Sequence, residues 1–204
     1  MGKNQPLTLE LFGKALQRLI EMVVLAKAHV KIGRGLGRIL SDDPAIAQVA
    51  HVFWGMSLTA HLDVAQLIAF KLFDTHHGTM TVHYLLENAE ALKNSLPHGT
   101  PEQLESVVGV ARTQISALAD PLRRIRAKRN RVLAHVDLTI ISNPFKLVAE
   151  VAVTFSDLNL ILGAAGNILN ELSVKLRDAS PLYDMLDSGD FETVIDLVAD
   201  AKCA

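Results

Sequence analysis

The chain has 204 residues, is 50% apolar and 21% charged, and carries a formal net charge of −2. This composition excludes a disordered protein, and no uncharged apolar run reaches the roughly 18 residues that a membrane span requires. The slightly acidic balance excludes a protein that coats nucleic acid over its whole surface, because such proteins carry a basic excess. We predict a soluble protein of one domain, residues 1–204, with its core over residues 44–178.

The ends of the chain indicate the compartment. Residues 1–6 lack the apolar core of a secretory signal, and the single cysteine, Cys203, has no partner for an internal disulfide. We therefore expect a cytoplasmic protein with no membrane partner.

Residues 7–32 carry apolar side chains at helical spacing, with Thr8 as the N-cap, and predict an N-terminal amphipathic helix. This helix is expected to close in the glycine-rich stretch Gly33–Arg38. Glycines at this spacing resemble a phosphate-binding loop, but such a loop follows a strand rather than a helix. The glycines are instead expected to end the helix or to let the next helix pack closely.

A second helix is predicted to begin at Pro44, where acidic residues and the proline favour a first turn, and to continue to Asp74. It is apolar on most sides, which is typical of the central helix of a bundle. His51, His61 and Asp63 lie within it. Histidines among apolar residues of a helix are more often hydrogen-bonded core residues than ligands, and the structural role is favoured here.

Residues 75–79 predict a loop, and residues 80–94 predict a shorter helix that carries His83. The spacing of the histidines matches neither the His-Glu-x-x-His zinc motif nor the Glu-x-x-His repeats of di-iron bundles. We expect no metal site and no cofactor.

A third long helix is predicted from Pro101 to Val136, with Thr100 as its N-cap. Residues 138–153 allow a short hairpin or an extended connection, and Ser156-Asp157 caps a helix that continues to Leu176. A small helix is expected at residues 190–201. The fold class is therefore all-α, an elongated bundle of about five to six helices.

The third long helix contains the most distinctive stretch of the chain. Six of the 20 Lys and Arg residues lie there. They are Arg123, Arg124, Arg126, Lys128, Arg129 and Arg131. Such a run is usually a solvated face, but this one is flanked by apolar segments and followed by His135 and Asp137. Because the helix C-terminus favours the imidazolium of His135 while the arginines oppose it, its pKa is expected near neutral pH.

The residues Arg129-Asn130-Arg131-Val132-Leu133-Ala134-His135 resemble the motif of the HEPN superfamily of all-helical domains. That motif is an Arg followed by a polar residue and then, a few residues later, by a His. The pattern Arg-Asn-x-x-x-Ala-His-x-Asp of residues 129–137, together with Phe53-Trp54 in an earlier helix, makes the chain most similar to the abortive-infection U-type branch. The resemblance covers the chain from the second helix to Asn170.

The chemistry that suits a lone His beside arginines is metal-independent cleavage of RNA by its own 2′-hydroxyl. His135 would be the general base or acid, and Arg129 would stabilise the charge that develops on the phosphate. The resemblance implies the same endoribonuclease activity, assigns Asn130 to positioning, and implies a toxin or anti-phage effector with a neutralising antitoxin protein. The residues expected to bind RNA are Arg123, Arg124, Arg126, Lys128 and Arg131, with Asp137 in a supporting role.

On an ideal helix Arg129 and His135 point about 120° apart, because six positions turn by about 600°. A distorted helix end, a bent Arg129 side chain or a second subunit would each bring them together. The resemblance favours the second subunit and hence a homodimer. Asp137 stands where one HEPN group has a tyrosine, so regulation through that tyrosine is not expected.

Two other functions stay open at this point. One is a non-catalytic HEPN-like module that binds a nucleotide or a protein partner. The other is an unrelated helical bundle whose basic stretch is only surface.

Overall fold

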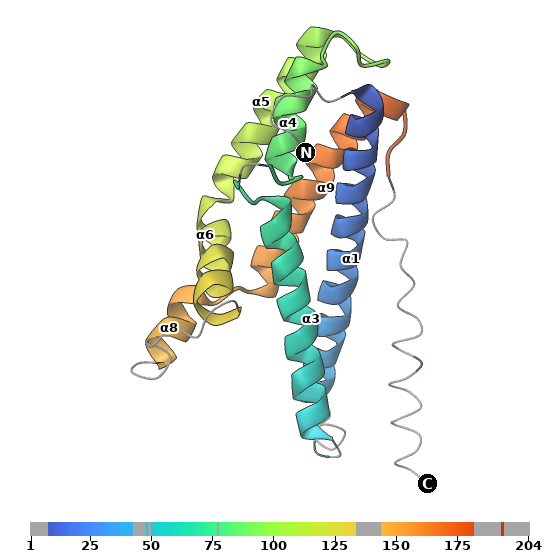
Figure 1. Cartoon of the computed structure of the whole chain (residues 1–204). Coiled ribbons are helices and arrows are strands. Elements are labelled where there is room, and N and C mark those ends of the chain that lie inside the picture. The colour runs from blue at the N-terminus through green and yellow to red at the C-terminus, as the bar shows by residue number, and fades with distance from the viewer. Residues whose placement is uncertain are drawn as a thin grey trace.

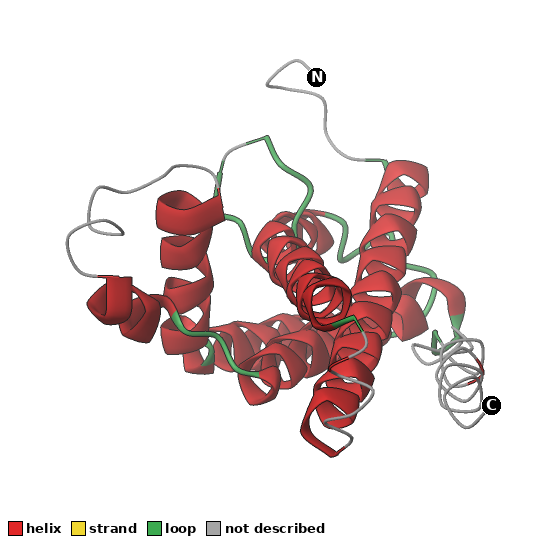
Figure 2. Cartoon of the chain, turned by 90° about the horizontal axis from the view of Figure 1, so that it is seen from below, coloured by secondary structure: helices red, strands yellow, loops and turns green. Residues whose placement is uncertain are grey.

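The computed structural model describes residues 8–42, 48, 50–76, 78–133, 144–181 and 193. Every regular element in this part of the chain is a helix (Figure 2), which confirms the all-α prediction. The elements are α1 (Leu9–Asp42), α3 (His51–Leu72), α4 (Val82–Ala91), α5 (Pro101–Ala117), α6 (Ala119–Lys128), the π-helical turn η1 (Arg129–Leu133), α8 (Pro144–Val151) and α9 (Phe155–Arg177).

The core is built around α1 and α9, which lie side by side in an elongated bundle (Figure 1). The two helices are antiparallel, since Gly13 of α1 lies against Leu176 while Gly33 lies against Phe155. Phe12, Leu16, Leu19 and other apolar residues of α1 are fully buried, together with residues of α3, α4, α5, α6 and α9. Burial of one apolar stripe per helix is what the 3.6-residue spacing predicts.

The ends of α1 and α3 project beyond the rest of the bundle as a two-helix arm, residues 33–42 and 51–60 (Figure 1). Leu36 and Trp54 form a small apolar cluster inside this arm. The side chains of Val52, Phe53 and Met56 are 59%, 60% and 69% exposed. The prediction that the second long helix is the central element is therefore wrong for its first turns, because among the described residues only α1 covers them.

The glycine-rich stretch does not end the first helix, which continues through it to Asp42. Among the described glycines only Gly78 and Gly99 have a positive φ, so Gly33 and Gly37 keep helical backbone angles. Each helical glycine costs about 0.5–1 kcal/mol relative to alanine, but the packing of Leu36 and its neighbours outweighs that cost. The expected closure at residue 33 and the phosphate-loop alternative are both wrong.

The third long helix starts as predicted, with a capping box in which Thr100 accepts from the backbone N–H of Gln103. It is not continuous: α5 ends at Ala117 and α6 begins at Ala119, with Leu118 between them. Pro121 explains the break, because a proline lacks the N–H that would bond to the carbonyl of Ala117 and its ring would clash with that carbonyl.

The segment before α9 corrects a further prediction. Residues 144–151 form α8 rather than a strand, and residues 152–154 form a short connection in which Thr154 is extended. Thr154, not Ser156, is the N-cap of α9, and it forms a capping box with Asp157. Residues 138–143, and all of 190–201 except Thr193, lie outside the described residues.

One stretch, Ala149–Arg177, is by length and composition apolar enough to cross a membrane. Residues 152–154 interrupt it, and the apolar residues of α9 are buried in the core, among them Leu158, Ile161 and Leu169. The core helix of a soluble protein has the same properties, so this stretch is weak evidence for a membrane span.

Candidate functional site

The basic segment occupies α6 and the π-helical turn η1. Ile125 and Pro121 are buried, which fixes α6 against the core while most of its cations remain at the surface. In η1 each backbone hydrogen bond joins residues five apart instead of four, so this turn is wider than a turn of α-helix. Such turns are frequent at functional sites. The helix end is therefore distorted at Arg129, one of the three arrangements that the motif allowed.

The Arg129 side chain has two neutral contacts. Its Nη1 donates to Oδ1 of Asn130 at 2.8 Å, and its guanidinium carbon lies 5.0 Å from the centre of the Phe70 ring on α3. The arginine and Asn130 are both exposed, and within the described residues Arg129 has no carboxylate partner. Its charge is thus held in place and left available for an anion.

Arg124 belongs to an ion-pair network that joins α6 to α9. It pairs with Asp120 on its own helix, and its Nη2 lies 2.6 Å from Oδ1 of Asp157. The side chains of Arg124 and Asp157 are only 23% and 15% exposed. Burial raises the pKa of Asp157, whereas hydrogen bonds from Thr154 and the charge of Arg124 lower it. The lowering effects are larger together, so the pKa lies below its usual value.

Two more cations of the segment are paired across elements. Lys128 Nζ lies 2.9 Å from Oδ1 of Asp63 on α3, with both side chains about a quarter exposed. Arg131 Nη1 lies 3.0 Å from Oε2 of Glu150 on α8. These pairs fix the helix end between α3 and α8, and any RNA contact by these residues would compete with them.

The last two cations lie on the outer side of α6. Arg123 forms an exposed pair with Asp120 at 2.7 Å. Arg126 is exposed and donates to Oγ1 of Thr75 at 3.4 Å. Among the described residues Arg126, like Arg129, lacks a carboxylate partner.

His83 of α4 is a second histidine near the segment. It is partly buried and packs edge-on to the Phe73 ring, with the ring centres 6.4 Å apart. Burial lowers the pKa of His83; Glu87 raises it and Arg126 lowers it. The net effect is a pKa below the ordinary value of histidine, so the imidazole of His83 is neutral near neutral pH.

His135 and Asp137 lie outside the described residues, which end at Leu133 in this region. The catalytic roles of Arg129, Asn130 and His135, and the supporting role of Asp137, therefore stay predictions.

Of the other histidines of the two long helices, His29 and His61 have structural environments. His51 is exposed, so the prediction of a core role is wrong for it. His29 of α1 and His61 of α3 have their Nδ1 atoms 2.8 Å apart, so one ring donates to the other. Burial lowers the pKa of both imidazoles, and the proximity of His61 lowers that of His29 further. No group of three or more metal-binding side chains occurs among the residues that the structure describes.

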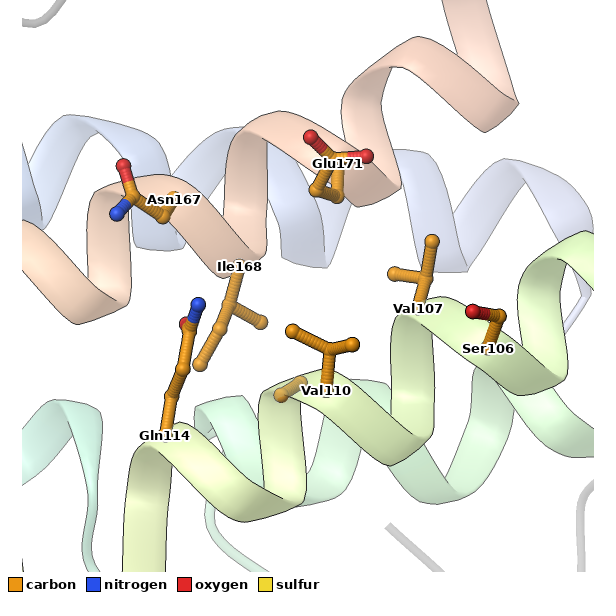
Figure 3. A pocket seen from close by; sticks show the side chains of 8 residues that line it. Ser106, Val107, Val110, Gln114, Asn167, Ile168 and Glu171 are labelled. Atoms are coloured by element: carbon orange, nitrogen blue, oxygen red, sulfur yellow. The ribbon is translucent and has the colours of Figure 1, made fainter. Parts of the chain in front are cut away.

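A groove of about 380 Å³ lies between α5 and α9 (Figure 3). Val107, Val110 and Ile168 form its apolar wall, and Gln114 and Asn167 extend beside them. It includes no residue of the basic segment, so it is not part of the candidate site.

An all-helical bundle that presents Arg-Asn at the end of a helix, with His135 following in the sequence, defines a HEPN-type domain. The family model described as AbiU2 (HEPN_AbiU2) matches residues 47–194, which is most of the chain. The chain belongs to this AbiU2 family of HEPN domains and is thus an abortive-infection type HEPN protein, which confirms the resemblance. Comparison with curated proteins and with solved structures gave no significant match.

Sequence reasoning missed the residues that surround the basic segment. Phe70, Asp63, Glu150 and Asp157 come from three other helices and have no motif of their own. The one available signal was the unexplained Asp63 in an otherwise apolar helix, since a partly buried carboxylate requires a cationic partner.

Proposed function

We propose that this protein is a cytoplasmic, metal-independent endoribonuclease that acts as an abortive-infection effector. Arg129 binds the scissile phosphate and stabilises the negative charge that develops on it. His135 takes the proton of the 2′-hydroxyl, whose oxygen attacks the phosphorus. The bond to the 5′-oxygen breaks, and this oxygen takes up a proton from water or from an imidazolium. The products are a 2′,3′-cyclic phosphate and a 5′-hydroxyl.

The observation that carries the proposal is the environment of Arg129. In a family defined by its Arg–His motif, this arginine lies at a π-helical turn, exposed, with neutral contacts to Asn130 and Phe70. A guanidinium that already bound a carboxylate would have to lose that partner before binding phosphate. No carboxylate in the part of the chain that the structure describes competes with phosphate for Arg129.

A direct test incubates labelled structured and single-stranded RNA with the purified chain in the presence of a chelator. Cleavage should persist, should leave cyclic phosphate ends, and should stop where a 2′-deoxy residue replaces the cleaved nucleotide. Arg129→Ala and His135→Ala should each lower the rate by about 100-fold or more.

The matched control is Arg112→Ala, which removes an exposed cation of α5 that pairs with Glu90 outside the basic segment and should leave cleavage within about twofold of wild type. Circular dichroism confirms that each variant is folded. Undiminished cutting by folded His135→Ala would end the nuclease proposal. A wild-type chain that binds a nucleotide or protein partner but cuts no RNA would select the non-catalytic module instead.

We also propose that the active form is a homodimer in which Arg129 of one chain and His135 of the other share a cleft. Mixing the Arg129→Ala and His135→Ala chains tests this. Half of the randomly formed dimers would be mixed, each with one intact composite site, so about a quarter of the wild-type activity should return. If each chain holds its own complete site, the mixture should regain no activity. Absence of activity in the mixture, or a monomer in light scattering, would contradict the shared site.

A further inference from the structure

A second group of cations lies on α1, outside the motif. Lys27, Lys31, Arg34 and Arg38 follow one another at spacings of four, three and four residues, and no Asp or Glu occurs between Glu21 and Asp42. At 100° per residue, the four side chains fall within an arc of roughly 60°. They form a single face of one helix.

Three of these side chains, Lys31, Arg34 and Arg38, are exposed and are called the basic stripe below. None has a carboxylate partner among the described residues. The Arg34 guanidinium lies over the Phe155 ring, 5.8 Å from its centre, which holds it at the start of α9 by a neutral contact. The stripe therefore presents positive charge that no carboxylate of the described residues neutralises.

The stripe begins at the level of the bundle where the motif lies and continues into the two-helix arm. Gly33, beside Arg34, packs against Leu62 of α3 and Phe155. The next residue of α3, Asp63, pairs with Lys128, which directly precedes Arg129. A short path of packed residues therefore connects the two regions across α3.

The chemistry of the stripe indicates a polyanion rather than an apolar protein surface. Between Lys27 and Asp42, α1 exposes no large apolar side chain. Gly35 and Gly37 lie between the cations, and a Cβ at Gly37 would meet no atom within 4 Å. A ligand backbone thus has room to approach the charges closely.

We propose that the basic stripe binds the phosphate backbone of the RNA substrate and guides the strand to Arg129. The inference rests on the proposed function for the identity of the polyanion. Residues 31–38 extend about 10 Å along the helix, enough for a few successive phosphates of a single strand. RNA is thus bound by α1 and cut at the motif.

The test measures binding of a fluorescent single-stranded 2′-O-methyl RNA, which cannot be cleaved, between about 50 and about 200 mM salt. The variant Lys31→Gln/Arg34→Gln/Arg38→Gln should bind at least about tenfold more weakly at low salt. The slope of log affinity against log salt should become less steep by about two, since each contact with a single strand contributes about 0.7.

The matched control is Lys14→Gln/Arg18→Gln/Arg112→Gln, which removes the same charge from exposed residues that pair with Glu10, Glu21 and Glu90. It should bind nearly as wild type. Equal weakening by both triple variants, or an unchanged slope in the stripe variant, would overturn the inference.

The readouts separate this inference from the proposed function. Stripe-dependent binding by a chain that cuts no RNA would refute the nuclease and retain the binding surface. The stripe variant could bind and cut RNA as wild type does, while cleavage still depends on His135. That result would support the nuclease and refute RNA binding by the basic stripe. Absence of any RNA binding by the wild-type chain would refute both.

Discussion

The two basic regions of this chain differ in what surrounds their charges. The segment from Arg123 to Arg131 is the richer in cations, yet carboxylates on α3, α8 and α9 neutralise Lys128, Arg131 and Arg124. The basic stripe has only three cations, and all are exposed without such partners among the described residues.

The density of cations in a sequence is therefore a poor measure of positive potential at the surface. A cation that is three-quarters buried beside a carboxylate fixes the positions of helices and contributes little net charge. In the segment, Arg126 and Arg129 alone lack a carboxylate among the described residues, so the proposed phosphate binding depends mainly on these two cations.

The largest effect should come from breaking the network that anchors the segment to α9. Asp157→Ala removes one of the two carboxylate partners of the partly buried Arg124, the one on α9, and also half of the capping box of α9. We expect a loss of about 2–4 kcal/mol in the free energy of unfolding, measured by urea denaturation.

Arg123→Ala is the matched control, since it removes an exposed ion pair with Asp120 from the same helix and should change stability by less than about 0.5 kcal/mol. Because the pKa of Asp157 is lowered in the fold, its contribution is present above the unfolded pKa and is lost as pH falls through the folded value. The wild-type chain should lose this stability in acid, and Asp157→Ala should not. Equal stability of Asp157→Ala and wild type would show that the network is not structural.

The second prediction concerns how Arg129 is held. Phe70→Leu removes the ring beneath the guanidinium while keeping an apolar side chain. A cation–π contact at such a site contributes about 0.5–1 kcal/mol, so cleavage should slow by roughly two- to fivefold. Phe70→Tyr retains the ring and should restore the rate. If Phe70→Leu cuts as fast as Phe70→Tyr at matched stability, the ring does not position Arg129.

The fold was predictable where local signals act. Thr8 and Thr100 cap their helices as expected, because a side-chain oxygen can bond to a backbone N–H only a few residues away. The glycines of α1 misled the prediction, since tertiary packing outweighs a small helix preference. The missing N–H of Pro121 indicates a break, whereas the apolar spacing on both sides of it predicts one continuous helix.

The candidate site was predictable only in part, for a related reason. A motif of neighbouring residues shows in the sequence, and the distortion of the helix end at Arg129 was one of the expected arrangements. The partners of Arg124 and Lys128 lie 33 and 65 positions away, so only the packing of the helices brings them together. The sequence shows the helical spacing of the cations of α1. Their exposure depends on how α1 packs against the other helices, as in the contact of Arg34 with Phe155 at the start of α9.

The third prediction concerns the His29–His61 pair, which joins α1 to α3. The pKa of both imidazoles is lowered in the fold, so the unfolded chain binds more protons, and stability falls as pH drops from about 6.5 toward the folded values. The Tm of the wild-type chain should therefore fall by a few degrees between about pH 7.5 and about pH 5.5.

His61→Gln should reduce this pH dependence, whereas His51→Gln, an exposed histidine of the same helix, should leave it unchanged. Calorimetry at several pH values gives the measurement. A His61→Gln profile parallel to that of wild type would show that the pair does not control acid stability.

The smallest expected effect compares two ion pairs directly. Asp63 and Lys128 are both about a quarter exposed, whereas Glu10 and Lys14 are 76% and 69% exposed and only one helical turn apart. Double-mutant cycles with Asp63→Asn/Lys128→Gln and with Glu10→Gln/Lys14→Gln measure each coupling. We expect about 0.5–1 kcal/mol for the first pair and less than about 0.5 kcal/mol for the second, because solvent and salt screen the exposed pair more strongly. A coupling for Asp63–Lys128 no larger than that of the exposed pair would mean that the basic segment is held by apolar packing alone. In that case Lys128 would remain available to bind RNA beside Arg129, and the contrast with the basic stripe would rest on Arg124 and Arg131 only.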